Sequence, residues 1–429
     1  MIERVNKLGR ATFLPIRLAA TAAALSGAAA AFSASPPASG ADAICRAADG
    51  FAAAFDGRRT FLLQPDHLRG IKARRDTDPA IAAAYRQLIA RADAALARRP
   101  GSVMDKTTIP PSGDRHDYLS IAPYWWPDPA NPRGPYVRRD GEVNPARDGN
   151  GYDRTAIGRM SGDVQALGLA YYYTDDPRYA QAAARAIRTW FLDPATAMNP
   201  NANFAQAVRG REDGRAEGVL DTNAFQPVVE TIGLIAPAKT LTSAENRALE
   251  AWFGRYVDWM QSSRNGRDEQ AAKNNHGIWY DDQITHYALF ARRADVAGKI
   301  VDAFPKRRIA AQMTPDGRLP AELARTRSFH YSIYALAPAY DVADLGSCLG
   351  KDLWNWRDDK GRGLRVATDF LARYRGQMAA WPYKEIKPEP GELDQLLARA
   401  AWAWPGSYAA TPTGYPLAVT IRSRAATAP

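Results

Sequence analysis

The sequence predicts an all-α protein with an α/α toroid, an incomplete α/α barrel of paired antiparallel helices, with long aromatic loops over a central cleft. Apolar residues recur at helical spacing along most of the chain, and no convincing run of alternating strand residues appears. The helix pairs recur at roughly 40 to 50 residues, the spacing of helical repeats and toroids. Self-similarity between the pairs is not found, which disfavours a regular solenoid. The number of helix pairs is left open.

The earlier helices are each justified by one apolar stripe with residues three and four positions apart. In chain order the stripes are Ile81, Tyr85, Leu88 and Ala92 within 78–99; Ile157, Met160, Val164, Leu167 and Tyr171 within 155–173; Tyr179, Ala183, Ala186, Ile187 and Trp190; and Leu249, Trp252, Phe253, Tyr256 and Met260. Start signals precede two of them. Asp176-Pro177 opens the third helix, and Thr242 with Glu245 forms a capping box before the fourth.

The later helices are expected from shorter stripes of the same kind. They run through 284–290, 296–304, 329–340, 364–374 and 393–402. The helix that contains 329–340 has its core stripe on Phe329, Ile333, Leu336 and Tyr340, and Tyr331 points about 200° away from Phe329 at 100° per residue. Such a phenol faces either a cleft or the solvent.

Two long stretches, 107–153 and 199–221, interrupt the helical pattern and are rich in aromatic residues and Arg. Loops of this length inside a compact domain are usually functional. Rings stack on sugar faces and Arg pairs with carboxylates, so we expect substrate contacts from residues of these loops: Tyr124, Trp125, Trp126, Gln206 and Arg215. The alternative is that Trp125 and Trp126 cover a hydrophobic edge.

The N-terminus is typical of a secretory signal. Basic residues precede an Ala-rich apolar run from Leu18 to Phe32, followed by small residues and prolines. We expect a signal peptide over 1–33, with cleavage between Ala31 and Ala43, and a single α/α-toroid domain over 44–429. The alternative is a membrane anchor, but the run is short for a span of about 20 residues. The expected location is periplasmic or secreted, without stable membrane insertion after cleavage.

The chain has a net charge of +10, with Arg in large excess over Lys. The expected signal carries four basic residues and one acidic residue, so the mature chain would keep about +7. An Arg-rich surface favours an anionic partner. An exported acidic glycan fits better than nucleic acid, although charge alone does not separate the two.

Only two cysteines are present, Cys45 and Cys348. In an oxidising compartment they could form one disulfide that ties the mature N-terminus to the late part of the chain. Two unpaired thiols remain the alternative, because spacing in sequence does not give distance.

Candidate chemistry is concentrated in Asn274-Asn275-His276 and in the segment 325–331, which ends in Tyr331. These segments offer an amide, an imidazole, guanidinium groups and a phenol. An amide and an Arg can hold a carboxylate while His or Tyr moves protons at the carbon beside it. Polymers of uronic acids are cleaved by this chemistry, so we interpret the chain as a polysaccharide lyase. The start of a helix after Asn274 adds partial positive charge.

Asn274-Asn275-His276, the longer segment from Glu322 to Tyr331 and the stretch from Tyr118 to Pro129 resemble the alginate lyase superfamily, most of all polysaccharide lyase family 38 and more distantly family 5. The resemblance covers roughly 114–340 and implies an α/α toroid that cleaves polyuronates by β-elimination without a metal or other cofactor. It implies that Asn275 and Arg325 neutralise the uronate carboxylate and that His276 assists or acts as base. Tyr331 would be catalytic base and acid. Arg327 is a second candidate for the Arg role, and Asn274 and Tyr334 are expected to contact substrate.

Stereochemistry narrows this mechanism. In D-mannuronate and D-glucuronate the C5 proton and the C4 oxygen lie on the same side, so Tyr331 alone can take the proton and return it. L-guluronate is the C5 epimer and would need an opposed base, for which His276 is available. An ordinary Tyr has a pKa of about 10, and we expect Arg325 to activate it.

Two other classes stay open. A glycoside hydrolase on the same toroid would use two carboxylates, with Asp221, Asp281 and Asp282 available. A non-catalytic protein that binds an acidic glycan, or a nucleic-acid binder, would carry no reaction. The five His residues show no HExxH motif or other close pairing, so no metal site is expected.

Overall fold

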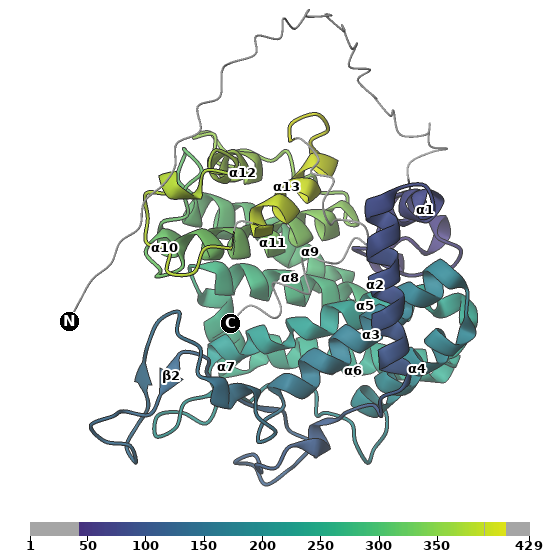
Figure 1. The fold of residues 1–429 in the computed structure, drawn as a ribbon, viewed down its shortest axis with the longest axis horizontal. Coiled ribbons are helices and arrows are strands. Elements are labelled where there is room, and N and C mark those ends of the chain that lie inside the picture. The colour runs from purple at the N-terminus through teal and green to yellow at the C-terminus, as the bar shows by residue number, and fades with distance from the viewer. Residues whose placement is uncertain (1–42, 390, 409–429) are drawn as a thin grey trace, which may run out of the picture. The chain divides into compact units, whose positions relative to one another are not determined.

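The helices form an inner row, which contains the most deeply buried helices, and an outer row packed against it (Figure 1). The computed structural model describes residues 43–389 and 391–408. The chain divides into two units, Met1–Ala41 and Asp42–Pro429, and every described residue belongs to the second. The signal peptide expected over 1–33 therefore lies outside the described residues.

The α-helices in the described residues are α1 Pro65–Arg74, α2 Pro79–Leu96, α3 Arg154–Thr174, α4 Pro177–Phe191, α5 Gln226–Leu234, α6 Ser243–Ser262, α7 Arg264–Ala271, α8 Asn275–Phe290, α9 Ala294–Phe304, α10 Pro320–Leu323, α11 Ser328–Ser347, α12 Leu364–Ala372 and α13 Gly391–Ala403. The strands are β1 Leu119–Ile121, β2 Trp125–Trp126, β3 Val137–Arg138 and β4 Phe204–Ala207. Helical turns of other kinds include a 3-10 helix over Ala216–Phe225 and a π-helix over Pro305–Ala310.

The inner row consists of α3, α5, α8 and α11, each in contact with the next. All of α5 is buried, as is all of α8 except His276. A helix that is buried around its whole circumference must be covered by other elements on every side. The outer helices provide that cover: α2 and α4 pack on α3, α6 and α9 on α8, and α12 and α13 on α11. The predicted all-α toroid is thereby confirmed.

Local sequence signals fix several helix starts. The Asp176 side chain accepts the backbone N–H of Arg178, and Thr242 and Glu245 form the reciprocal capping box that the sequence predicts. At α8 the Asn274 side chain accepts the backbone N–H of His276, so the Asn–His segment does open a helix.

The two long loops contain short strands, which the helical patterning did not predict. Strand β1 of the first loop pairs in parallel with β4 of the second, and β2 pairs with β3 in an antiparallel manner. Strands of two to four residues are too short to show an alternating pattern. The second loop also ends earlier than expected, because the 3-10 helix begins at Ala216. The β1–β4 pairing holds both loops together.

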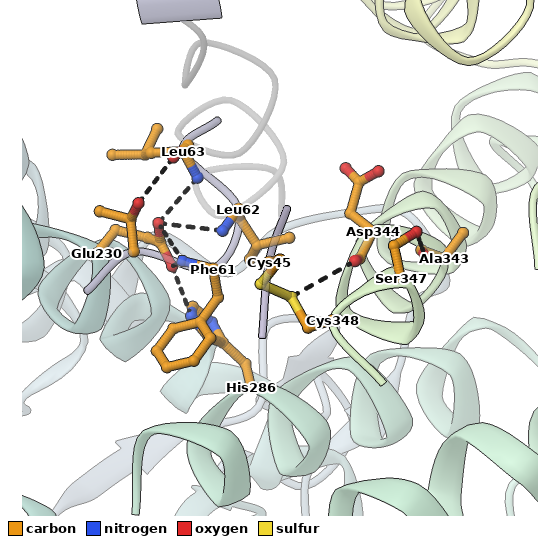
Figure 2. Close-up of a disulfide and its surroundings, with 11 residues drawn as sticks. Cys45, Phe61, Leu62, Leu63, Glu230, His286, Ala343, Asp344, Ser347 and Cys348 are labelled. Carbon is orange, nitrogen blue, oxygen red and sulfur yellow. Dashed lines mark hydrogen bonds and ion pairs between the residues drawn. A yellow bond between two sulfur atoms is a disulfide. The ribbon is translucent and has the colours of Figure 1, made fainter. Parts of the chain in front are cut away.

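The two cysteines are bonded. Cys45 and Cys348 form a disulfide across 303 positions of sequence, with their Cα atoms 4.5 Å apart (Figure 2). Nearby, the Glu230 carboxylate accepts the backbone N–H groups of Phe61 and Leu63 and faces the imidazole of His286. The segment that follows Cys45 is therefore tied to the inner helices by a covalent bond and a buried carboxylate.

None of the helices in the described part of the chain is long and apolar enough to cross a membrane.

Candidate active site

A cavity of about 460 Å³ lies between the two long loops and the starts of α8 and α11. Its walls bring together most of the residues that the sequence singles out. These are Tyr124, Trp125, Gln206, Arg215, Asn274, Asn275, His276, Arg325, Tyr331 and Tyr334. The sequence separates these residues by up to 210 positions, and the inner row of helices with the paired loops brings them to one place.

Asn275 is the first residue of α8 and is completely buried. Its backbone N–H and its side-chain Nδ2 donate to the two oxygens of Glu322, at 2.6 and 2.8 Å. Its Oδ1 is buried without a hydrogen-bond partner in the described part of the chain. The Glu322 carboxylate thus fixes the orientation of the amide, and burial raises the pKa of that carboxyl despite the hydrogen bonds from Asn275.

His276 is held through one ring nitrogen by Glu269 of α7. The Nδ1 atom lies 2.6 Å from Glu269 Oε1, and 18% of the His276 side chain stays exposed whereas Glu269 is buried. Burial on its own would lower the pKa of His276, but the charge and hydrogen bond of Glu269 outweigh it, so the pKa is raised. The pair therefore keeps a proton to higher pH than a free imidazole, and Nε2 is the ring nitrogen available to a ligand.

Arg325 is engaged by a carboxylate that the sequence did not single out. Its Nη2 and Nε donate to Asp140 at 2.8 and 3.2 Å, and its Cζ lies 3.7 Å from the centre of the Tyr331 ring. Burial would raise the pKa of Asp140, but the hydrogen bonds and charge of Arg325, together with bonds from Thr326, lower it to about 2. Arg325 is thus a fixed positive charge beside the phenol.

Tyr331 projects from the first turn of α11 into the cavity and is 4% exposed. Its hydroxyl lies 2.5 Å from that of Tyr124. Burial and the neighbouring Tyr124 raise the pKa of Tyr331 well above its ordinary value, and the opposing charge of Arg325 does not compensate. The sequence predicts a phenol activated by Arg325, whereas the free protein holds Tyr331 in its neutral form.

The loop wall of the cavity is aromatic and basic. The guanidinium carbons of Arg211 and Arg215 lie 5.1 and 6.0 Å from the Trp125 ring centre. Arg215 also donates to the Gln206 side chain at 3.1 Å, and Gln206 in turn donates to Asp221 at 3.0 Å. Gln206 has a φ of 51°, which is strained for a residue with a Cβ and is typical of functional sites.

Of the described residues proposed from sequence, two lie outside this lining. Arg327 is buried and its Nη2 donates to Glu389, so the choice between Arg325 and Arg327 falls on Arg325 as the guanidinium at the cavity. Trp126 packs beside Arg139 and donates its indole N–H to the carbonyl of Glu142.

Several residues at the site were missed by sequence reasoning. The three carboxylates Glu269, Glu322 and Asp140 hold His276, Asn275 and Arg325, and Arg147 and Arg154 also line the cavity. A weak signal exists only for Glu322, which stands three positions before Arg325. Asp140 and Glu269 come from other elements, and sequence gives no measure of their distance. Within 43–389 and 391–408, no group of three or more His, Cys, Asp or Glu residues is arranged to hold a metal ion.

The helical toroid and its similarity to a solved alginate lyase place the chain among the polysaccharide lyases. The family model described as alginate lyase matches residues 102–381, and the chain belongs to this family. A search of curated proteins finds no match.

Solved structures agree with this assignment. An alginate lyase from Bacteroides ovatus is 40% identical to the chain, with a TM-score of 0.78 over 82% of this chain and 93% of that one. A histidine-to-alanine variant of alginate lyase A1-III complexed with tetrasaccharide is 17% identical, with a TM-score of 0.51 over 80% of this chain and 95% of that one. The second likeness concerns the fold alone.

Proposed function

We propose that the chain cleaves a polyuronate by β-elimination without a metal, leaving an unsaturated uronate at the new end. The observation that carries the proposal is the convergence of Asn275, His276, Arg325 and Tyr331 on one cavity. Together they offer groups to neutralise a carboxylate and a group to move a proton, which are the two requirements of this reaction.

In this proposal His276 and Asn275 bind the carboxylate of the uronate. The Glu269 carboxylate keeps a proton on the imidazole, so the ring can offer positive charge. The Asn275 amide nitrogen has two hydrogens and gives one to Glu322, which leaves the other for substrate. Drawing charge out of the carboxylate acidifies the C5–H bond beside it.

Arg325 takes a different role from the one that the family resemblance implies. Its guanidinium is already paired with Asp140, and it stacks against the Tyr331 ring. It therefore acts mainly on the phenol, because a positive charge there favours the ionised form of Tyr331. The substrate carboxylate then depends chiefly on His276 and Asn275.

In the elimination step, a single phenol serves first as the base and then as the acid. Ionised Tyr331 takes the C5 proton, the C–H electrons form the C4=C5 double bond, and the C4–O bond breaks. The leaving oxygen then takes the proton from Tyr331, which returns to its ionised form. This same-side path fits β-linked D-mannuronate and D-glucuronate, whose C5 hydrogen and C4 oxygen share one side of the ring.

The raised pKa of Tyr331 has a consequence for this cycle. The phenol is protonated in the free enzyme near neutral pH, so only a minor fraction is reactive. That fraction grows with pH, because the proton is lost more readily to solvent. We therefore expect turnover to rise toward alkaline pH until the imidazolium of His276 is lost.

The hydrolase alternative needs two carboxylates across the cleaved bond. Asp281 and Asp282 are completely buried, and Asp281 pairs with Arg308. Asp221 lines the cavity but accepts hydrogen bonds from Ser120 and Gln206. The three acids considered from sequence thus do not make a pair at the cavity, which favours elimination.

The substrate class proposed is mannuronate-rich alginate or β-1,4-glucuronan. The two are equivalent at the reacting carbons, and the similarity to an alginate lyase from Bacteroides ovatus supports the first. The aromatic and basic wall around Trp125 suits a chain of charged sugars. Nucleic acid is not proposed as a ligand.

The test is an assay of alginate, polymannuronate, polyguluronate, glucuronan and hyaluronan, with ultraviolet absorbance of the unsaturated product. Activity that persists in EDTA on polymannuronate or glucuronan is expected. New reducing ends without ultraviolet absorbance would instead indicate a hydrolase. Added duplex DNA is expected to leave the rate unchanged.

Export to the periplasm or the medium, with one mature domain from about residue 44, is proposed as well. The disulfide supports it, because structural disulfides persist in oxidising compartments. To test this, the full chain is expressed in a Gram-negative host, and the N-terminal residue of the exported protein is determined by sequencing. A protein that keeps Met1 in the cytoplasm would contradict it.

A further inference from the structure

We infer that Arg308, which lies outside the cavity lining, is a positioning residue for the catalytic histidine. It fixes the junction between α7 and α8, so that Glu269 of one helix meets His276 of the other. The kinetic part of this inference rests on the proposed lyase function, whereas the structural part does not.

The side chain of Arg308 is 2% exposed and makes contacts in two directions. On one side, Nη1 donates to the carbonyl of Ala272 and Nη2 to that of Gln270, both at 2.7 Å. On the other side, Nε and Nη2 donate to the two oxygens of Asp281, at 2.8 and 3.1 Å. One planar guanidinium thus joins the backbone beside α7 to a buried carboxylate of α8.

The carbonyls that Arg308 binds lie at the C-terminal end of α7. The last carbonyls of a helix have no partner within the helix and carry partial negative charge, so a cation at this end is favourable. Residue 269 stands just before these carbonyls, and residues 275 and 276 begin the next helix. The position of α7 relative to α8 decides whether Glu269 and His276 meet, and Arg308 holds both sides.

Gly277 shows how tight this junction is. A Cβ at Gly277 would lie 2.2 Å from Nη1 of Arg308 and 2.3 Å from the carbonyl oxygen of Ala272. Real Cβ atoms do not approach so closely, so only a glycine lets the guanidinium reach across. The residue immediately after His276 is therefore in direct contact with Arg308.

The backbone that carries Arg308 has an unusual conformation. It lies in the π-helix Pro305–Ala310, which follows α9, and π-helical turns often occur near functional sites. The preceding residue, Arg307, donates to Asp281 at 3.1 Å, makes no side-chain hydrogen bond to α7 within the described residues and is more exposed. Arg307 is thus a matched control, since it shares the carboxylate but not the junction.

Charged groups from several elements face the imidazole of His276. Glu269 of α7 and Glu217 of the 3-10 helix raise its pKa, and Arg215 lowers it. Glu322 of α10 interacts with it as well. Of these groups only Glu269 contacts His276 across the α7–α8 junction. A displacement of α7 relative to α8 should therefore change the effect of Glu269 on the pKa of His276 more than the effects of the other groups.

The experiment compares Arg308→Lys with Arg307→Lys. Lysine keeps the charge, but its three donors are on one nitrogen atom and cannot replace the four hydrogen bonds that the planar guanidinium makes. Arg308→Lys is expected to lower kcat roughly 10- to 100-fold with little change in KM, as for a small displacement of a catalytic group. The pKa of His276, followed by histidine NMR with His276→Gln for assignment, should fall toward about 6.5. Arg307→Lys should leave both values close to those of the wild type.

A folded Arg308→Lys protein with unchanged kcat and unchanged His276 pKa would overturn the inference, even with a lower Tm. In the double variant with Glu269→Gln, the losses should fall short of additive, because both changes act on one pair. If Arg308→Lys does not fold, Gly277→Ala replaces it, because the added Cβ would displace the same guanidinium. That variant must then lower the pKa of His276 in the same way. A wild type without lyase activity would contradict the proposed function, while the NMR titration would still decide the role of Arg308.

Discussion

The guanidinium carbon of Arg325 lies 3.7 Å from the centre of the Tyr331 ring, while its Nε and Nη2 atoms donate to Asp140. A guanidinium fixed in this way cannot turn toward a substrate without leaving its carboxylate. Its charge is therefore directed at the phenol. The same design recurs at the other site residues, since Glu269 holds His276 and Glu322 holds Asn275.

Replacement of Tyr331 by Phe removes the proposed base and acid and nothing else. The hydroxyl shares a hydrogen bond with Tyr124 alone among the described residues, so the fold should survive its loss. We expect kcat to fall by about 10²- to 10⁴-fold, the usual contribution of a general acid–base group. Product absorbance measures the rate and circular dichroism checks the fold. A variant that retains most of the wild-type activity would remove Tyr331 from the mechanism.

Replacement of Glu269 by Gln tests the charge on His276. The carboxylate raises the pKa of the imidazole, so its removal should lower that pKa. A group with a raised pKa keeps its proton below that value and loses it as the pH rises through it. The decline of kcat/KM at high pH should therefore begin at lower pH in the variant. An unshifted profile would mean that the imidazolium is not required.

Asp140→Asn tests how much the ion pair between Asp140 and Arg325 stabilises the protein, and how this stabilisation depends on pH. The pKa of Asp140 is lowered from 3.8 to about 2, so its ion pair stabilises the folded protein fully above about pH 4. That contribution is lost as the pH falls from there toward 2. The difference in Tm between wild type and variant should be largest near neutral pH and narrow between pH 4 and 2. A difference that stays constant over this interval contradicts the prediction.

Trp125 and Trp126 are neighbours in sequence but differ in position, because Trp125 alone of the two lines the cavity. Trp125→Ala should raise KM for a polyuronate about fivefold, the equivalent of about 1 kcal/mol of lost ring contact. Trp126→Ala is the control and should leave KM within about twofold. Equal effects of the two substitutions on KM would contradict the prediction that only Trp125 contacts the substrate.

Replacement of both cysteines by Ser should reduce stability with little effect on kcat at 25 °C. Cys45 and Cys348 lie at the segment held by Glu230, not among the cavity residues. The loss expected is about 2–4 kcal/mol of unfolding free energy, as for other native disulfides. Chemical denaturation with and without reductant measures it. Reductant should destabilise the wild type and leave the double Ser variant unaffected.

The sequence by itself determined the helical class, most helix positions and the two segments that meet at the cavity. These follow from local rules: apolar residues at helical spacing, an Asn or Thr cap at a helix start, and a phenol set off the core stripe of α11. The segment Asn274–His276 opens α8, and Tyr331 lines the cavity, as the spacing predicts.

Only the tertiary structure decided which polar and charged groups pair with one another. Asp140 meets Arg325 across 185 positions of sequence, and Glu322 meets Asn275 across 47. It also separated Arg325 from Arg327 and Trp125 from Trp126, and it showed that burial outweighs the guanidinium at Tyr331. Helical spacing depends on neighbouring residues, whereas a pKa depends on solvent exclusion and on charges brought close by folding, which no local pattern records.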